Sequence, residues 1–319
     1  MEYKQLTSLV EEFAKTFAAL PLEVQESYLA SLRLSFVHNT VAIEGNKASL
    51  LDAAELLLKY KVIPQKIGYQ DVFDLVGQDL ALARMREYAE LKTPVDQDVI
   101  CELHRIALYP TPFAGRYRNT SVVVHGGVGQ VSAVAHISRD MRFFVEDLRH
   151  LQFSNPIEKA AFTHCQFVKI HPFADGNGRT ARLIMNLSLL NDDFPLVDIN
   201  VKNREAYMQA VESYVCANDL KPFQEFLAQT LSLQIKDFLA QCSEGTLPDK
   251  EAHYKGVFFV SIRANANKSA LCRVLDRIEG AQYSEKYHVW VIPNSERELV
   301  ENIAGVEIYD SIADVPHGA

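Results

Sequence analysis

The sequence predicts a mainly helical protein that ends in a small α+β domain. Through residues 1–243, apolar side chains recur every three or four positions, which is typical of amphipathic helices. After residue 248 the pattern changes to short apolar strands alternating with helices. The 319 residues also exceed the length of one typical domain. We therefore expect an N-terminal helical region at 1–48, a main helical domain at 49–243 and a small accessory domain at 250–319.

The composition is that of an ordinary globular protein, with 48% hydrophobic and 23% charged residues. The net charge of −9 makes nucleic acid an unlikely partner, because binding to phosphate backbones needs clustered Lys and Arg. Five scattered cysteines lack metal-ligand spacing and indicate a reducing, cytoplasmic location. We see no signal peptide and no apolar run of membrane-spanning length, so no membrane association is expected.

Prolines and glycines set the expected helix boundaries. The helices are predicted to cover residues 1–35, with a break near Pro21, and then 50–60, 69–88, 98–108, 139–148, 158–170, 179–190, 203–214 and 222–242.

The stretch from His171 to Arg182, His-Pro-Phe-Ala-Asp-Gly-Asn-Gly-Arg-Thr-Ala-Arg, carries most of the chemistry. Its glycine-containing loop opens into a helix, and a helix N-terminus offers free N–H groups and positive dipole to an anion. Arg179 and Arg182 suit phosphate oxygens, and Asp175 supplies the hard oxygen that Mg²⁺ takes beside a nucleotide. His171 can accept a hydroxyl proton near neutral pH. Together they predict a phosphoryl- or nucleotidyl-transfer site.

Other interpretations of this loop fit less well. A Walker A loop requires Lys followed by Ser or Thr after its second glycine, but Arg179-Thr180 stands there. An EF-hand would place Phe173 and Ile184 at ligand positions, where neither can bind calcium as required. A purely structural turn does not require His, Asp and two Arg together.

The stretch resembles the signature of the Fic family, His-Pro-Phe-x-Asp/Glu-Gly-Asn-Gly-Arg-x-x-Arg, and matches every fixed position. The resemblance extends from about Ser35 to Phe226. It implies a Fic-type helical bundle with a β-hairpin flap, in which His171 is the base and Asp175 holds Mg²⁺. The residues that it implies for nucleotide binding are Gly176, Asn177, Gly178, Arg179, Thr180, Arg182 and Tyr207.

A second motif, Thr40-Val-Ala-Ile-Glu44-Gly45-Asn46, ends an apolar helix with a carboxylate. This placement is unusual, because the C-terminal end of a helix dipole repels negative charge. An exposed Glu at a frayed helix end is the plain alternative. The stretch resembles the Fic inhibitory motif Ser/Thr-x-x-x-Glu-Gly/Asn, which implies that Glu44 holds Arg182 in a bidentate pair and keeps it from the γ-phosphate.

In residues 121–134 the helical spacing of apolar residues is replaced by β-branched residues and glycines, which predicts a β-hairpin. In the Fic family this hairpin is a flap whose edge holds the target backbone, here Val122, Val123, Val124 and His125. A glycine-rich surface excursion is the alternative. Arg116 and Arg118, in a segment resembling Gly-x-Tyr-Arg before the hairpin, fit packing and ion pairing at least as well as catalysis.

The C-terminal segment predicts the order β-α-β-β-α-β, a ferredoxin-like candidate with strands at 257–262, 281–283, 287–292 and 306–311. No recognisable set of catalytic residues lies there, so we expect an accessory interaction domain.

The resemblance implies a protein adenylyltransferase that moves AMP from ATP, with Mg²⁺, to a Tyr, Thr or Ser hydroxyl of a target protein and is inhibited by its own Glu44. The target could be the protein itself, and a homodimer is a candidate assembly. Three alternatives stay open. The donor could carry UMP or phosphocholine, the enzyme could remove AMP with Glu44 positioning water, or the domain could only sense nucleotide.

Overall fold

The computed structural model describes residues 3–59, 67–122, 131–247, 257–263, 268–278, 281–284 and 289–309. The chain divides into two compact units, Met1–Leu247 and Pro248–Ala319.

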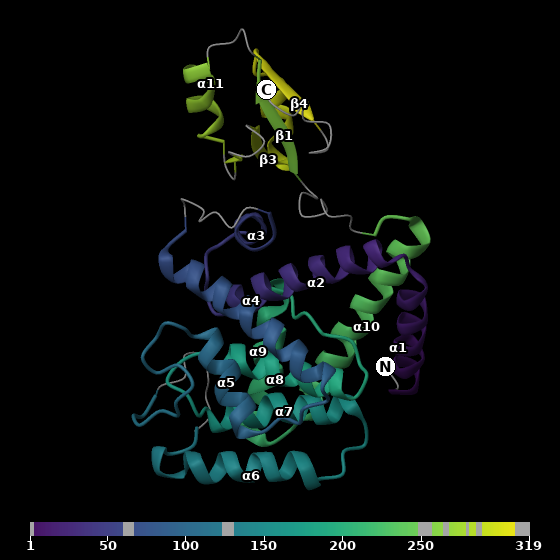
Figure 1. The fold of residues 1–319 in the computed structure, drawn as a ribbon, viewed down its shortest axis with the longest axis vertical. Coiled ribbons are helices and arrows are strands. Elements are labelled where there is room, and N and C mark those ends of the chain that lie inside the picture. The colour runs from purple at the N-terminus through teal and green to yellow at the C-terminus, as the bar shows by residue number, and fades with distance from the viewer. Residues whose placement is uncertain are drawn as a thin grey trace. The chain divides into compact units, whose positions relative to one another are not determined.

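The first unit is helical, which confirms the predicted fold class (Figure 1). Its elements are α1 (Tyr3–Ala19), α2 (Leu22–Ile43), α3 (Leu50–Ala54), the π-helical η1 (Glu55–Lys59), α4 (Tyr69–Glu90), α5 (Gln97–Ala107), the 3-10 turn η2 (Val134–His136), α6 (Ile137–His150), α7 (Pro156–Ile170), α8 (Asn177–Asn191), the 3-10 turn η3 (Val201–Asn203), α9 (Arg204–Ala217) and α10 (Lys221–Glu244).

Several helix boundaries lie where proline and glycine predict them. The first helical segment breaks at Pro21, and α2 ends at Ile43 with Gly45 in the left-handed region at φ 100°. The helix expected at 50–60 is α-helical only over Leu50–Ala54, and it continues as a π-helix at Glu55–Lys59. In this wider turn Leu56 is buried, while Leu57 and Leu58 are only partly buried.

Helix α8 is the centre of the first unit (Figure 1). Every residue from Arg179 to Leu189 is buried, so this helix is enclosed on all sides. Its Leu183 and Leu187 belong to one hydrophobic cluster, to which α2, α3, α4, α5, α6 and α7 contribute. Its Met185 and Leu189 belong to a second cluster, formed with α1, α7, α9 and α10. The first turn of α8 is therefore held by the packing of the whole unit.

Partly buried polar contacts fix α2, the helix that carries Thr40 and ends before Glu44. Arg33 donates from Nε and Nη2 to the two carboxylate oxygens of Asp79 on α4, each at 2.5 Å. Ser35 and Asn39 both donate to Asp198 Oδ2, at 2.5 and 2.8 Å. Burial raises the pKa of Asp198 to about 6, although these two donors act to lower it.

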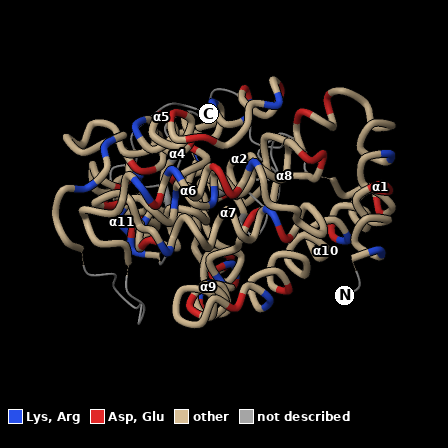
Figure 2. The backbone as a smooth tube through the Cα atoms, turned by 90° about the horizontal axis from the view of Figure 1, so that it is seen from below, with Lys and Arg blue, Asp and Glu red and all other residues tan. Residues whose placement is uncertain are grey.

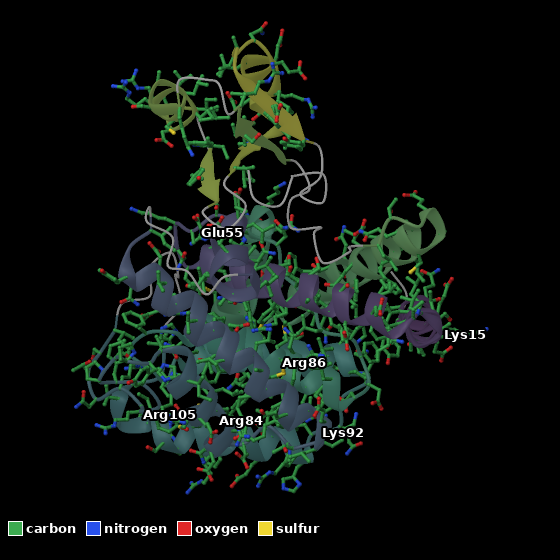
Figure 3. The ribbon with its side chains drawn as sticks, turned by 45° about the horizontal axis from the view of Figure 1, so that its top comes forward. Lys15, Glu55, Arg84, Arg86, Lys92 and Arg105 are labelled. Atoms are coloured by element: carbon green, nitrogen blue, oxygen red, sulfur yellow. The ribbon has the colours of Figure 1, made fainter. Side chains whose placement is uncertain are left out.

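Surface charges tie further elements together. Figure 3 labels Arg84 on α4, whose guanidinium contacts Glu87 at 2.7 Å and Glu102 on α5 at 2.9 Å. Lys92, also labelled there, donates to the carbonyls of Leu190 and Asn191 at the end of α8. Figure 2 shows Lys and Arg interspersed with Asp and Glu along the helices, as expected for a solvated surface.

The second unit has the predicted βαββαβ order. It comprises β1 (Val257–Ile262), α11 (Lys268–Leu275), β2 (Gln282–Ser284), β3 (Val289–Pro293), the 3-10 turn η5 (Asn294–Glu296), α12 (Arg297–Glu301) and β4 (Val306–Tyr309). The strands lie in the order β2-β3-β1-β4, and each neighbouring pair is antiparallel. Phe258, Val260, Trp290 and Ile292 from β1 and β3 form its core with Leu275 from α11. Among the described residues of the whole chain, no helix is long and apolar enough to cross a membrane.

Gly77 provides a test of the packing between α4 and α5. A β-carbon at this position would lie 2.6 Å from the carbonyl oxygen of Ala107. Helix propensity alone predicts that Gly77→Ala gains about 0.5–1 kcal/mol, but the clash is with backbone and predicts a loss of about 1–3 kcal/mol. We expect the loss, measured as the free energy of unfolding in urea. A gain in stability would contradict the close approach of the two helices.

Candidate active site

The loop from His171 to Gly176 connects α7 to α8 through two left-handed residues. His171 closes α7 with φ 53° and ψ 60°, and Gly176 precedes α8 with φ 73°. For a non-glycine residue, a left-handed conformation is strained and persists only where its surroundings enforce it. The predicted loop between two helices is present, although α8 begins at Asn177, earlier than Arg179.

Two buried side chains hold this loop in shape. The Asn177 amide accepts from the N–H of Phe173 at 3.0 Å and donates to its carbonyl at 2.9 Å. His104, on α5, stacks on the Phe173 ring with centroids 3.6 Å apart and lies 3.0 Å from the Asp175 carbonyl through Nε2. The Asn177 side chain therefore stabilises the loop, while its backbone forms the first residue of α8.

The hydrogen bonds of His104 fix its protonation. Its Nδ1 accepts from the N–H of Gly115 at 2.7 Å, so the ring proton is on Nε2 and points to the Asp175 carbonyl. Burial lowers the pKa of His104 to about 4, which keeps the ring neutral. His104 was not singled out from the sequence. Its signal was a lone histidine on the apolar face of α5, beside buried Ile100 and Leu103.

His171 is held from its backbone, which leaves its ring available for chemistry. Its N–H donates to the Phe167 carbonyl at 2.9 Å, and its own carbonyl accepts from Arg118 Nε at 2.8 Å. Burial lowers the pKa of the ring below its ordinary value of 6.5, and the Val168 carbonyl opposes this shift. The imidazole is therefore neutral at pH 7, as a proton acceptor must be.

Arg118 joins His171 to both ends of the predicted flap. Besides the bond to His171, its Nη1 donates to the Thr120 carbonyl at 3.0 Å and its Nη2 to the Ser132 carbonyl at 2.5 Å. These contacts give Arg118 a positioning role, in line with the packing interpretation. Of the predicted flap residues, Val122 is partly buried, and Val123, Val124 and His125 lie outside the described residues.

Arg179 and Asp175 form an ion pair at the mouth of the loop, with Arg179 Nη2 3.3 Å from Asp175 Oδ2. The Asp175 side chain is 65% exposed and also accepts from the N–H of Gly176 at 2.6 Å. Arg179 is buried and makes a shorter contact, 2.7 Å, to Asp74 on α4. Asp74 was not predicted, because nothing in the spacing of α4 separates it from other helix-surface carboxylates.

Arg182 is almost completely enclosed, with a side chain that is 2% exposed. Its Nη2 donates to Glu44 Oε1 at 2.7 Å and to the Thr40 carbonyl at 2.9 Å, and its Nε donates to Thr40 Oγ1 at 2.6 Å. Its Nη1 donates to the Tyr207 hydroxyl at 3.0 Å. The structure thus pairs Arg182 with Glu44, but the bidentate geometry that we expected is wrong. Only one nitrogen faces the carboxylate, because Thr40 and Tyr207 occupy the others.

The Glu44 carboxylate lies against the first turn of α8. A β-carbon at Gly178 would collide with Glu44 Oε1 and would lie 3.2 Å from Arg182 Nη1, so only glycine leaves room for this carboxylate. Burial alone would raise the pKa of Glu44, but Arg182, with help from Arg179 and Arg204, outweighs it and lowers the pKa. A negative charge beside a helix N-terminus and two arginines is electrostatically favourable.

Two predicted nucleotide-binding side chains are buried among other protein groups. Thr180 is fully buried within α8. Tyr207, expected near the nucleotide base, is 2% exposed and bonds to Arg182 and His164. At the start of α8 the structure brings together His171, Asp175, Gly176, Asn177, Gly178, Arg179, Arg182 and Glu44, and Tyr207 contacts this set only through Arg182.

The donors present fit a magnesium ion that arrives with a nucleotide. Among the residues that the structure describes, no three His, Cys, Asp or Glu side chains cluster as a metal site would require. A single exposed carboxylate such as Asp175 is what Mg²⁺ uses when phosphates supply other ligands.

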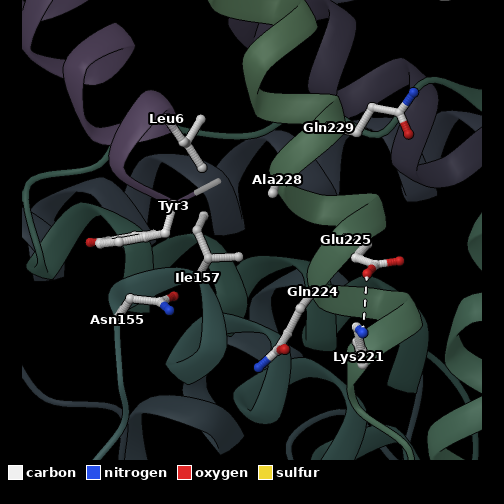
Figure 4. A pocket seen from close by; sticks show the side chains of 9 residues that line it. All are labelled: Tyr3, Leu6, Asn155, Ile157, Lys221, Gln224, Glu225, Ala228 and Gln229. Carbon is white, nitrogen blue, oxygen red and sulfur yellow. Dashed lines mark ion pairs between the residues drawn. The ribbon is translucent and has the colours of Figure 1, made fainter. Parts of the chain in front are cut away.

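Figure 4 shows a different cleft, of about 700 Å³, between α1, the start of α7 and α10. Tyr3, Leu6 and Ile157 contribute apolar surface, and Lys221 pairs with Glu225 at its edge. None of its lining residues belongs to the candidate active site.

The helical fold and this site match a known class of proteins. Residues 94–189 match the Fic/DOC family, and the chain therefore contains a Fic domain. The structure of Fic-1 residues 134–508 from Caenorhabditis elegans superposes with a TM-score of 0.66 at 29% identity, over 76% of this chain and 73% of that one. A Fic-domain signaling protein from Bacteroides thetaiotaomicron has the same fold, with a TM-score of 0.66 at 24% identity, over 76% of this chain and 96% of that one.

Two curated relatives are named protein adenylyltransferases. The chain is 36% identical over 211 residues to protein adenylyltransferase fic-1 of Caenorhabditis elegans, covering 64% of this chain and 41% of the relative. It is 32% identical over 253 residues to protein adenylyltransferase Fic of Nematostella vectensis, covering 75% and 57%. The chain thus spans about half the length of these relatives.

The buried, neutral His104 predicts an acid sensitivity of folding. Because its pKa is about 4 in the folded protein and about 6.5 when unfolded, only the unfolded chain binds this proton between those pH values. The contribution of neutral His104 to the free energy of unfolding is fully present above pH 6.5. It falls by about 1.4 kcal/mol per pH unit as the pH drops toward 4.

His104→Gln removes the titrating imidazole and supplies a neutral amide that can still donate and accept hydrogen bonds. We expect the free energy of unfolding of the variant to fall less steeply than that of the wild type between pH 6.5 and 4, measured by urea titrations across that range. Identical slopes for the two proteins would contradict a neutral, buried His104.

Proposed function

We propose that the protein transfers AMP from ATP to a hydroxyl side chain of a protein and that Glu44 restrains this activity. The observation that carries the proposal is the Glu44 carboxylate between Arg182 and Gly178, where it takes the position of an anion at the start of α8. The relatives named protein adenylyltransferase support the choice of AMP. The target would be another protein or a second copy of this one, and a reducing, ATP-containing compartment such as the cytoplasm suits the reaction.

His171 would act on the incoming hydroxyl. Its neutral ring can take the proton as the oxygen attacks the α-phosphorus, and pyrophosphate leaves with the electrons of the broken P–O bond. Arg118 would support this role by positioning, because it donates to the His171 carbonyl and to carbonyls at both ends of the segment that would hold the target.

The phosphates would lie at the first turn of α8. The backbone N–H groups of Asn177 and Gly178 would face them, whereas the N–H of Gly176 already donates to Asp175. Arg179 and Arg182 would neutralise their charge. Asp175 would hold Mg²⁺, which supplies charge neutralisation to the phosphates when bound. Because Asp74 and Asp175 already orient Arg179, little reorganisation is needed there.

Glu44 would restrain transfer by competing for Arg182. The Arg182 nitrogen that faces Glu44 is the one that would meet the terminal phosphate, and a second anion in this place is repelled. ATP could still bind, but with its phosphates poorly aligned for in-line attack.

The experiment that tests this proposal is Glu44→Gly. Removing one charge-assisted hydrogen bond should raise the rate of AMP transfer about fivefold to a hundredfold. We expect labelling of the protein itself, or of proteins in a lysate, measured with ATP radiolabelled at the α-phosphate and by intact mass.

Glu90→Gly is the matched control, because Glu90 is an exposed carboxylate at the end of another long helix, α4. It should leave labelling at the wild-type level. If Glu44→Gly and Glu90→Gly label alike, the restraint is not at Glu44. UMP transfer in place of AMP by the Glu44→Gly variant would reject ATP as the donor.

A pH profile tests His171 as the base. Its pKa is lowered below 6.5, so the neutral form that accepts a proton is lost only as the pH falls through that lowered value. We expect the transfer rate of the Glu44→Gly variant to decline on the acid side with a midpoint below 6.5. A midpoint above 7, or retained transfer by Glu44→Gly with His171→Ala, would remove His171 from this role.

A further inference from the structure

The hydrogen bonds of Arg182 come from two sources. Thr40 lies in the last turn of α2 and Glu44 directly follows this helix, in the segment proposed to restrain the enzyme. Tyr207 belongs to α9 and accepts from Nη1 at 3.0 Å. Because a guanidinium can only donate, the Tyr207 oxygen is the acceptor here and its own proton must go elsewhere.

His164 on α7 provides the place for that proton. Its Nε2 lies 2.9 Å from the Tyr207 oxygen, and both side chains are buried. The hydroxyl therefore donates to Nε2, so the imidazole is neutral and carries its proton on Nδ1. Burial, with the nearby charge of Arg182, lowers the pKa of His164 and is consistent with this form. Nδ1 faces Cys165 Sγ at 3.8 Å, and the ring stacks on Phe223 with centroids 4.5 Å apart.

We propose that Tyr207 and His164 are positioning residues that hold Arg182 ready for the terminal phosphate of the nucleotide, independently of α2. This inference rests on the proposed function. Tyr207 fixes Nη1 and leaves Nη2, on the Glu44 side, to meet the phosphate. When Glu44 no longer competes, α7 and α9 still hold the guanidinium, because neither helix is part of the restraint.

The inference separates Tyr207 from a role at the nucleotide base. A residue that contacts the base affects ATP and ADP alike, since both carry it. A residue that positions Arg182 affects mainly the nucleotide whose terminal phosphate Arg182 binds. The preference for ATP over ADP therefore distinguishes the two roles.

The test compares Tyr207→Phe with Tyr214→Phe, each in the Glu44→Gly protein. Tyr214 is the matched control, because it lies on the same helix and its hydroxyl donates to Gln166 at 2.8 Å, away from Arg182. Titration calorimetry gives the affinities for ATP and ADP with Mg²⁺. Tyr207→Phe should reduce the preference for ATP about tenfold, as expected for one hydrogen bond to a charged group, and Tyr214→Phe should not change it.

Two further comparisons test the chain of contacts. In a Glu44→Gly, Arg182→Ala protein, Tyr207→Phe should have no additional effect on the preference, because the group that it positions is gone. His164→Leu should reduce the preference in the direction of Tyr207→Phe, and His164→Gln, whose amide oxygen can accept the Tyr207 proton, should recover part of it. Thermal unfolding confirms that each variant is folded.

The outcomes separate this inference from the proposed function. If the Glu44→Gly protein binds no ATP, the proposed nucleotide use is wrong and the inference falls with it. If it prefers ATP and Tyr207→Phe weakens ATP and ADP equally, or keeps its full effect without Arg182, the positioning role is wrong and the proposed function stands.

Discussion

The site depends on how a fully enclosed guanidinium is satisfied. An arginine removed from water is costly unless its donors are paired, and Arg182 is paired through Nε, Nη1 and Nη2 with Thr40, Tyr207 and Glu44. These partners come from the last turn of α2, from the residue that follows it and from α9, so segments far apart in sequence converge on one side chain. The position of α8 at the junction of both hydrophobic clusters makes this convergence possible.

The same constraint explains the polar contacts along α2. A helix that delivers a carboxylate to a fixed guanidinium must itself be fixed in rotation and translation. Arg33–Asp79 and the bonds of Ser35 and Asn39 to Asp198 supply this along its length. Further along, Arg204 Nε donates to the Ile43 carbonyl at 2.8 Å, which satisfies one of the free carbonyls at the helix end. Without such contacts, a single ion pair at a helix end would hold the helix only weakly.

Sequence reasoning could predict what is local in the chain. The loop between α7 and α8, the glycine after Glu44 and the change to a βαββαβ pattern all follow from neighbouring residues. The contacts of Asp74, His104 and Arg118 were not predicted, since each joins segments separated by 50 or more residues, and spacing along a helix says nothing about a distant partner. Tyr207 shows the limit best. Its place on an apolar stripe was visible, but which group its hydroxyl meets depends on how α9 packs against α7 and α8.

Gly178 has a consequence for how this protein can vary. The space left by its missing side chain is what allows a carboxylate to lie against the start of α8, and a phosphate would need the same space. A larger residue there would exclude the restraint and the substrate together. Mutations that remove the restraint but keep phosphate binding are therefore confined to α2 and Glu44, because a mutation at Gly178 would affect both.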